Sequence, residues 1–177
     1  MVWIRQHAAR YGVDAARIAV FGGSAGGTLA GEVATAGSGP LDQGARVAAA
    51  VSWSGLLDLH ELAIHGSTTD KDIVAAYMQC GAHPETKCPD KLAAASPITG
   101  VDSSDPPMFL GTSYGDYIPY TQATAMDRQL KAHHVFAELK IVVGNCHSID
   151  CKDDLILNSL GFLEAQLGVS HGERTSA

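Results

Sequence analysis

A serine set between glycines follows the first apolar run of the chain. Residues 20–33 read VFGGSAGGTLAGEV, and residues 22–26 fit the pattern G-x-S-x-G around Ser24. Where this pattern joins a strand to a helix, the sharp turn strains the serine backbone and lifts the hydroxyl above the sheet. The glycines at 22 and 26 are expected to let strand and helix approach each other. We therefore predict that Ser24 is a nucleophile, held at the positive end of a helix.

Other functions of these glycines fit the sequence less well. A phosphate-binding loop has the pattern G-x-x-x-x-G-K-[ST], but Thr28 stands where the lysine is needed. The dinucleotide pattern G-x-G-x-x-G has no match in this stretch. An inert glycine-rich turn explains the five residues almost as well as a nucleophile does. The residues that could act with Ser24 therefore decide between the two.

A serine hydroxyl attacks an ester when a base takes its proton, and that base is usually a histidine oriented by a carboxylate. His147, in KIVVGNCHSID, lies just beyond an expected strand and just before an expected helix, and we predict that it is the base. Asp116, in GTSYGDYIPY, follows another expected strand and is the predicted acid. The alternatives are a structural loop histidine at 147 and an aspartate at 116 that caps the helix beginning near Pro119.

Apolar runs alternate with segments of helical spacing along the whole chain. This order predicts parallel strands joined by helices, and therefore one α/β domain over residues 1–177. A lid-like excursion is expected at about 56–104, irregular from 79 to 107. Trp53 and Tyr77 are candidates to line a pocket there, and the alternative for both is an ordinary aromatic side chain of the core. The expected strands are 17–21, 46–54, 107–113 and 135–144, and the expected helices are 28–36, 56–78, 120–133 and 153–167.

Three segments resemble the α/β-hydrolases, in particular esterase- and lipase-like carboxylesterases: GGSAGG at 22–27, GDYIPYTQA at 115–123 and GNCHS at 144–148. The resemblance implies a mostly parallel sheet flanked by helices and a triad of Ser24, Asp116 and His147. It also implies that the Ala25 N–H is one oxyanion donor. The implied activity is hydrolysis of a small carboxylic ester through an acyl-enzyme, with no metal or organic cofactor.

The start of the chain departs from that family. Its members place an H-G-G-G loop and several strands before the nucleophile, whereas Ser24 follows only 23 residues and the sequence contains no H-G-G-G. The chain therefore resembles the C-terminal part of such an enzyme, truncated at its N-terminus. Strand 17–21 would then be an open sheet edge that favours a homodimer. A catalytically silent binding or interaction module is the alternative function.

Composition limits the partners and the compartment. A formal net charge of −7 argues against nucleic acid and anionic membrane surfaces as partners. The apolar runs are too short for a membrane span and no secretory signal is visible, so we expect a soluble protein, cytoplasmic or secreted. Cys80 with Cys88, and Cys146 with Cys151, suit two local disulfides as well as four free thiols. Cys80, His83 and Cys88 lack a fourth ligand for zinc, so no metal site is expected.

Overall fold

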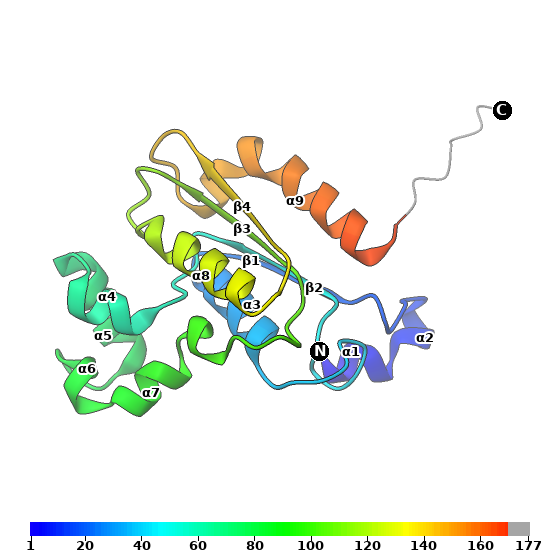
Figure 1. Ribbon diagram of the computed structural model, residues 1–177, viewed down its shortest axis with the longest axis horizontal. Helices are drawn as coiled ribbons and strands as arrows, with labels where there is room; N and C mark the ends of the chain where they lie inside the picture. Colours follow the sequence, from blue (N-terminus) through cyan, green and yellow to red (C-terminus); the bar gives the residue numbers. More distant parts are fainter. Residues whose placement is uncertain (170–177) are drawn as a thin grey trace.

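Four parallel strands form one sheet in the order in which they occur along the chain. The structure is a computed structural model that describes residues 1–169; the last eight residues of the expected domain lie outside the described residues. Each strand pairs in parallel with the next one in the sequence, so each connection between strands must cross over a face of the sheet (Figure 1). The α/β fold class is confirmed. The strands are β1 (Ala19–Gly23), β2 (Ala49–Trp53), β3 (Met108–Ser113) and β4 (Ala137–Val142).

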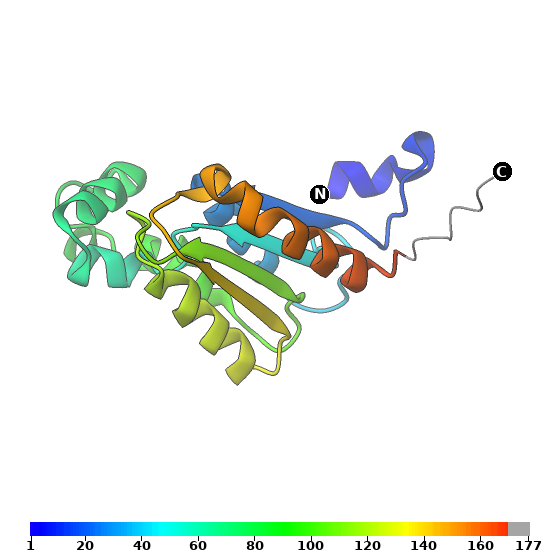
Figure 2. The same cartoon turned by 90° about the horizontal axis from the view of Figure 1, so that it is seen from above.

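Helices cover both faces of this sheet (Figure 2). Helices α3 (Ala25–Thr35) and α8 (Thr121–Ala132) pack on one face, and α9 (Lys152–Leu167) packs on the other. Strands β2 and β3 are buried throughout because both of their faces are covered. Strand β1 is an edge of the described sheet, and its Phe21 side chain is 47% exposed. The helices expected at 28–36, 120–133 and 153–167 are confirmed to within a few residues as α3, α8 and α9.

A lobe of short helices connects β2 to β3 and projects from the sheet (Figure 1). The prediction of a single helix at 56–78 is wrong, because one helix ends before Gly66 and a second begins after Ser67. Ser67 accepts a hydrogen bond from the Asp70 N–H while the Asp70 carboxylate accepts from the Ser67 N–H, a capping box that starts a new helix. The two helices are α4 (Leu59–His65) and α5 (Thr68–Met78).

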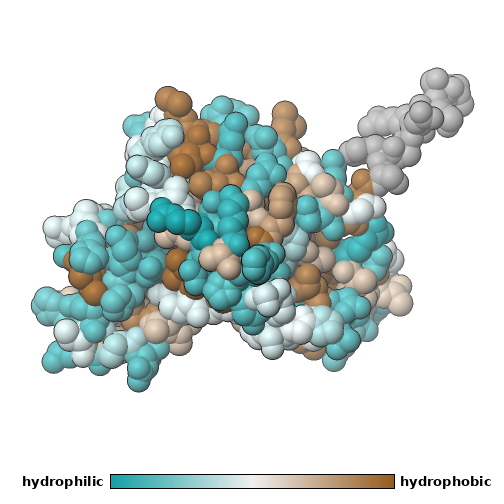
Figure 3. Space-filling view, viewed as in Figure 1, coloured by the Kyte–Doolittle hydropathy of each residue, from teal (hydrophilic) through white to brown (hydrophobic). Residues whose placement is uncertain are grey.

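The segment expected to be irregular, 79–107, is partly helical. Three short helical turns lie in it, and each has a proline in its first turn, where the missing N–H costs nothing. The lobe has its own apolar core, which includes Leu59, Leu62, Val74 and Leu92. Figure 3 shows hydrophilic residues over much of its surface with hydrophobic ones between them. The helical turns are α6 (Pro84–Lys87), α7 (Pro89–Ala94) and η1 (Pro97–Gly100).

The two N-terminal helices, α1 (Val2–Gln6) and α2 (Ala8–Tyr11), lie beside the start of the sheet (Figures 1 and 2). The Arg5 guanidinium donates to the backbone carbonyls of Ala15 and Arg46. Arg46 precedes β2, so this contact fixes α1 near the amino ends of the strands. The carboxyl ends, where ligands bind in open α/β sheets, are at the opposite side.

Both cysteine pairs form disulfides, Cys80–Cys88 in the lobe and Cys146–Cys151 after β4. This result decides between the disulfides and free thiols that the sequence left open. Because Cys80 and Cys88 bond to each other, they are not thiolate ligands for a metal. Within residues 1–169, no three His, Cys, Asp or Glu side chains gather as a metal site, and no helix is long and apolar enough to cross a bilayer.

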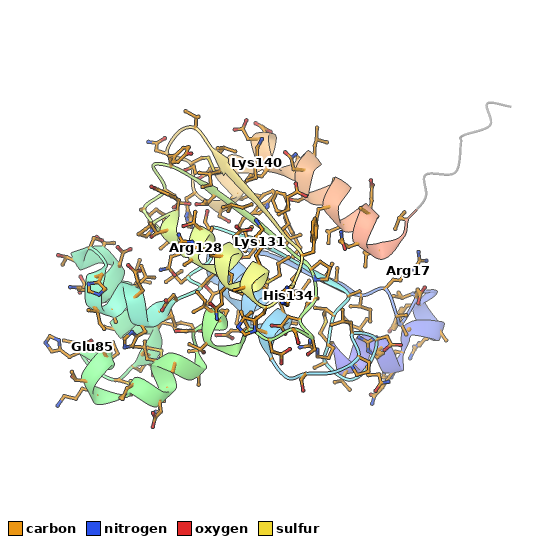
Figure 4. The ribbon with its side chains drawn as sticks, viewed as in Figure 1. Arg17, Glu85, Arg128, Lys131, His134 and Lys140 are labelled. Atoms are coloured by element: carbon orange, nitrogen blue, oxygen red, sulfur yellow. A yellow bond between two sulfur atoms is a disulfide. The ribbon has the colours of Figure 1, made fainter. Side chains whose placement is uncertain are left out.

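Positive side chains are spread over separate elements. Figure 4 places Arg128 and Lys131 on α8, Lys140 on β4 and Arg17 ahead of β1. Two of them are paired locally, Lys131 with Asp127 at 2.7 Å and Arg17 with Asp14 at 2.7 Å. That nucleic acid is not a partner stays a prediction from the net charge.

Candidate active site

Ser24 lies in the tight turn between β1 and α3. Its backbone has φ 55° and ψ −124°, a conformation that is strained for a residue with a side chain. Backbone hydrogen bonds hold it there: the Ser24 N–H donates to the Trp53 carbonyl at 2.8 Å, and the Ser24 carbonyl accepts from the Thr28 N–H at 3.1 Å. The turn therefore has the backbone geometry expected of a nucleophile elbow.

Of the two glycines expected to let strand and helix approach each other, Gly22 has this role and Gly26 does not. A Cβ at Gly22 would lie 2.0 Å from the Gly26 carbonyl oxygen, so strand and helix are in contact at this point as expected. A Cβ at Gly26 would meet nothing within 4 Å, and the expectation that position 26 must be small is wrong. The second close approach is at Gly27, where a Cβ would lie 2.7 Å from the Trp53 carbonyl oxygen. The pattern places this approach one residue too early.

The structure brings Ser24, His147 and Asp116 together from three different connections. His147 Nε2 lies 2.8 Å from Ser24 Oγ, and His147 Nδ1 lies 2.8 Å from Asp116 Oδ1. If Nδ1–H donates to Asp116, Nε2 is left to accept the serine proton. These distances agree with the contacts expected of a nucleophile, a base and an orienting acid, the roles predicted for the three residues.

Asp116 is not the cap of the following helix. Its Oδ1 also accepts from the Ile118 N–H at 3.0 Å, a local turn two residues along the chain, while α8 has Tyr120 at its N-cap position. The carboxylate side chain is fully buried. A buried carboxylate that is hydrogen bonded to a histidine orients the imidazole ring and stabilises its charged form. The helix-cap alternative for Asp116 is therefore wrong.

The loop that carries His147 is fixed by contacts that the sequence analysis missed. Ser113 Oγ, at the end of β3, donates to the Cys146 carbonyl at 2.7 Å. Ser54, directly after β2, accepts at Oγ from the Ser148 N–H at 3.0 Å. The sequence did offer a signal for both residues, because each is a serine at, or directly after, the end of a buried parallel strand. Those strand ends meet at the site.

Tyr117 is a second missed residue. Its ring centroid lies 4.1 Å from that of His147, with the planes inclined by 35°, so it lies against one face of the imidazole ring. The sequence places Tyr117 next to the predicted acid, but nothing in the sequence indicates this contact.

Ala25 begins α3, and the first N–H groups of a helix have no partner within it. Ala25 and Thr28 also line a cavity of about 70 Å³ together with lobe residues. Burial, followed by the charge of Glu32, raises the pKa of Tyr77, whose hydroxyl donates to Glu32 Oε1 at 3.4 Å. Trp53, the other expected lining residue, is instead 1% exposed in the core, where its Nε1–H donates to Ser159 Oγ at 2.9 Å. The lobe residues that line the cavity are Leu56, Leu59, Ile73 and Tyr77.

Comparison with known proteins gives related enzymes. The family model described as BD-FAE matches residues 1–130. A probable carboxylic ester hydrolase, LipM of Mycobacterium tuberculosis, is 31% identical over 152 residues, which are 78% of this chain and 34% of LipM. The chain thus spans about a third of the length of this curated relative.

Solved structures share the fold. A truncated form of a carbohydrate esterase from gut microbiota matches with a TM-score of 0.78 and 23% identity, over 94% of this chain and 65% of that one. An esterase from the Planctomycetes species Thermogutta terrifontis matches with a TM-score of 0.68 and 22% identity, over 97% of this chain and 62% of that one. The expected α/β-hydrolase fold is confirmed by these neighbours.

Proposed function

The chain belongs to the BD-FAE family, and from this premise we propose that it is a serine hydrolase that cleaves carboxylic esters through an acyl-enzyme on Ser24. The observation that carries the proposal is the pair of 2.8 Å contacts from His147, one to Ser24 and one to Asp116. The name of the relative LipM, a probable carboxylic ester hydrolase, supports the same reaction class.

In the proposed reaction His147 Nε2 takes the Ser24 proton as the serine oxygen attacks the ester carbonyl. Asp116 holds the ring and stabilises the imidazolium that forms. The Ala25 N–H, at the start of α3, donates to the oxyanion. His147 then protonates the leaving alcohol, and water attacks the acyl-enzyme by the reverse sequence, which frees the acid.

We further propose that the acyl group of the substrate is short. The cavity beside Ala25 is about 70 Å³, far below the ~300–1,000 Å³ that is common for pockets of larger ligands. Its lining is almost entirely apolar side chains, which suit an alkyl group.

The first test is the intact mass of the protein after treatment with a fluorophosphonate, followed by peptide mapping. We expect one adduct on Ser24, none in Ser24→Ala, and strongly slowed labelling in His147→Ala. His60→Ala is the matched control, because His60 is exposed on α4 and should label at the wild-type rate. Folded protein with no adduct would contradict the proposal and favour the silent binding module.

The second test compares p-nitrophenyl esters of increasing acyl length. We expect kcat/KM to be highest for acetate or propionate and to fall for octanoate. Ile73→Ala enlarges the cavity and should shift the preference to longer chains, whereas Ile64→Ala, outside the cavity lining, should not. A wild-type preference for octanoate would refute the short acyl pocket while leaving the ester hydrolase intact.

A further inference from the structure

The predicted base lies inside a small disulfide ring. Cys146 immediately precedes His147, and Cys151 ends the 3-10 turn η2 (Ser148–Cys151) that follows it. Cys151 is 1% exposed and packs in the core between the sheet and α9, with Cys146 against the same cluster. The sulfur bridge therefore ties both ends of the His147 segment to the interior of the protein.

This segment has an unfavourable backbone. After β4 the chain leaves the sheet through Val143, which is 89% exposed, and Gly144, at φ 123°. Ser148, next to His147, has φ 51°, a conformation that a residue with a side chain rarely adopts. Such conformations persist only where the surroundings over-determine them. The Ser113 and Ser54 hydrogen bonds supply part of that constraint, and the Cys146–Cys151 bridge closes the same segment covalently.

We propose that the Cys146–Cys151 disulfide is a positioning element for His147, so that its reduction by a dithiol slows the chemistry at Ser24. The dithiol supplies two electrons and two protons: the S–S bond breaks, Cys146 and Cys151 become thiols, and the reagent becomes a cyclic disulfide. Cys146 is half-buried and Cys151 buried, so the reagent reaches the Cys146 sulfur first. This inference rests on the proposed function for its activity readout.

The second disulfide of the chain provides the control. Cys80–Cys88 lies in the lobe, and its cysteines do not line the cavity beside Ala25. In Cys80→Ser/Cys88→Ser only the disulfide at His147 remains, and in Cys146→Ser/Cys151→Ser only the lobe disulfide remains. Each variant is compared with itself before and after the dithiol, so differences in basal activity between variants do not enter.

The experiment measures the rate of fluorophosphonate labelling and the kcat and KM for p-nitrophenyl acetate, with thiols counted by mass. For Cys80→Ser/Cys88→Ser we expect the dithiol to lower the labelling rate and kcat about tenfold to a hundredfold, as expected of a base misplaced by about 1 Å, with KM nearly unchanged. Reoxidation should restore both. Cys146→Ser/Cys151→Ser should not respond to the dithiol.

An unchanged rate in Cys80→Ser/Cys88→Ser, once both thiols at 146 and 151 are counted as free and circular dichroism shows a folded protein, would overturn the proposal. The comparison of Cys80→Ser/Cys88→Ser before and after reduction tests the proposal even if Cys146→Ser/Cys151→Ser fails to fold. The Nδ1 proton of His147, hydrogen bonded to Asp116 and followed by NMR, gives a readout independent of activity. Its loss on reduction supports positioning even in a protein that never labels, whereas absence of labelling before reduction refutes the proposed function.

Discussion

Gly22 and Gly26 occupy equivalent places in the G-x-S-x-G pattern, but alanine should have opposite effects at the two positions. A Cβ at Gly22 would be 2.0 Å from the Gly26 carbonyl oxygen and 2.3 Å from its carbon, whereas ordinary contact begins at 3.4 Å. Relief therefore requires β1 and α3 to separate locally by about 1.4 Å, the difference between 3.4 and 2.0 Å. Both partners are backbone atoms, so no side chain can rotate away.

Overpacking of this kind costs about 1–3 kcal/mol and sometimes more, and a backbone clash belongs at the upper end. We expect Gly22→Ala to lower the free energy of unfolding by about 3 kcal/mol. For a chain of this length that corresponds to a fall in Tm of about 6–12 °C, at ~2–4 °C per kcal/mol. The Cβ added by Gly26→Ala would meet nothing within 4 Å, and the substitution removes a glycine from a helix. It should therefore stabilise the protein by up to about 1 kcal/mol.

Urea unfolding followed by circular dichroism, with both disulfides intact, measures the two changes, and fluorophosphonate labelling reports on Ser24. Gly22→Ala should label slowly because the displaced turn carries the serine. Gly26→Ala should keep at least wild-type stability. Equal stability of the two variants would refute the assignment of the close approach to position 22.

Three further predictions concern packing, the base and assembly. Arg46→Met leaves Asp105 buried without its partner and should destabilise the protein by about 3–5 kcal/mol at neutral pH. Burial raises the pKa of Asp105, so its buried charge destabilises the folded state above that pKa and no longer does so once acid protonates the carboxyl. The loss of unfolding free energy in Arg46→Met, measured with urea, should therefore be smaller in acid than at neutral pH. Tyr117→Leu should lower kcat by removing the ring from His147, with rescue in Tyr117→Phe and no effect in Tyr114→Phe, measured with p-nitrophenyl acetate. The β1 edge should pair with a second copy of the chain, and a monomer at high concentration in light scattering would contradict this.

Much of the fold follows from periodicity and from residues next to strand ends. The apolar runs are short and several are rich in Val and Ile, and helices cover both faces of the sheet that they form. The triad candidates could be chosen because parallel strands end at one edge of the sheet, so residues that follow different strands converge there. Ser24, Asp116 and His147 each follow a different strand.

The lobe could not be predicted in the same way. Its helices are short, and each begins at a local feature, such as the Ser67–Asp70 capping box, rather than through long-range periodicity. The sequence also left open whether Trp53 lines a pocket or packs in the core, because its burial depends on α9, which supplies Ser159 from more than a hundred residues away. Sequence pattern predicts which residues lie near the site, but packing decides whether a side chain faces the substrate or the core.

Each strand contributes one polar group to the site. Ser24 follows β1, Asp116 follows β3 and His147 follows β4, while Ser54, after β2, accepts from the Ser148 N–H beside His147. The four described strands therefore position the proposed triad and the loop that carries its histidine. In the proposed reaction the Ala25 N–H, at the start of α3, donates to the oxyanion. Loss of one donor costs about 100–1,000-fold in rate. Labelling of Ser24 that depends on His147 therefore tests the proposed triad separately from the rate of ester turnover.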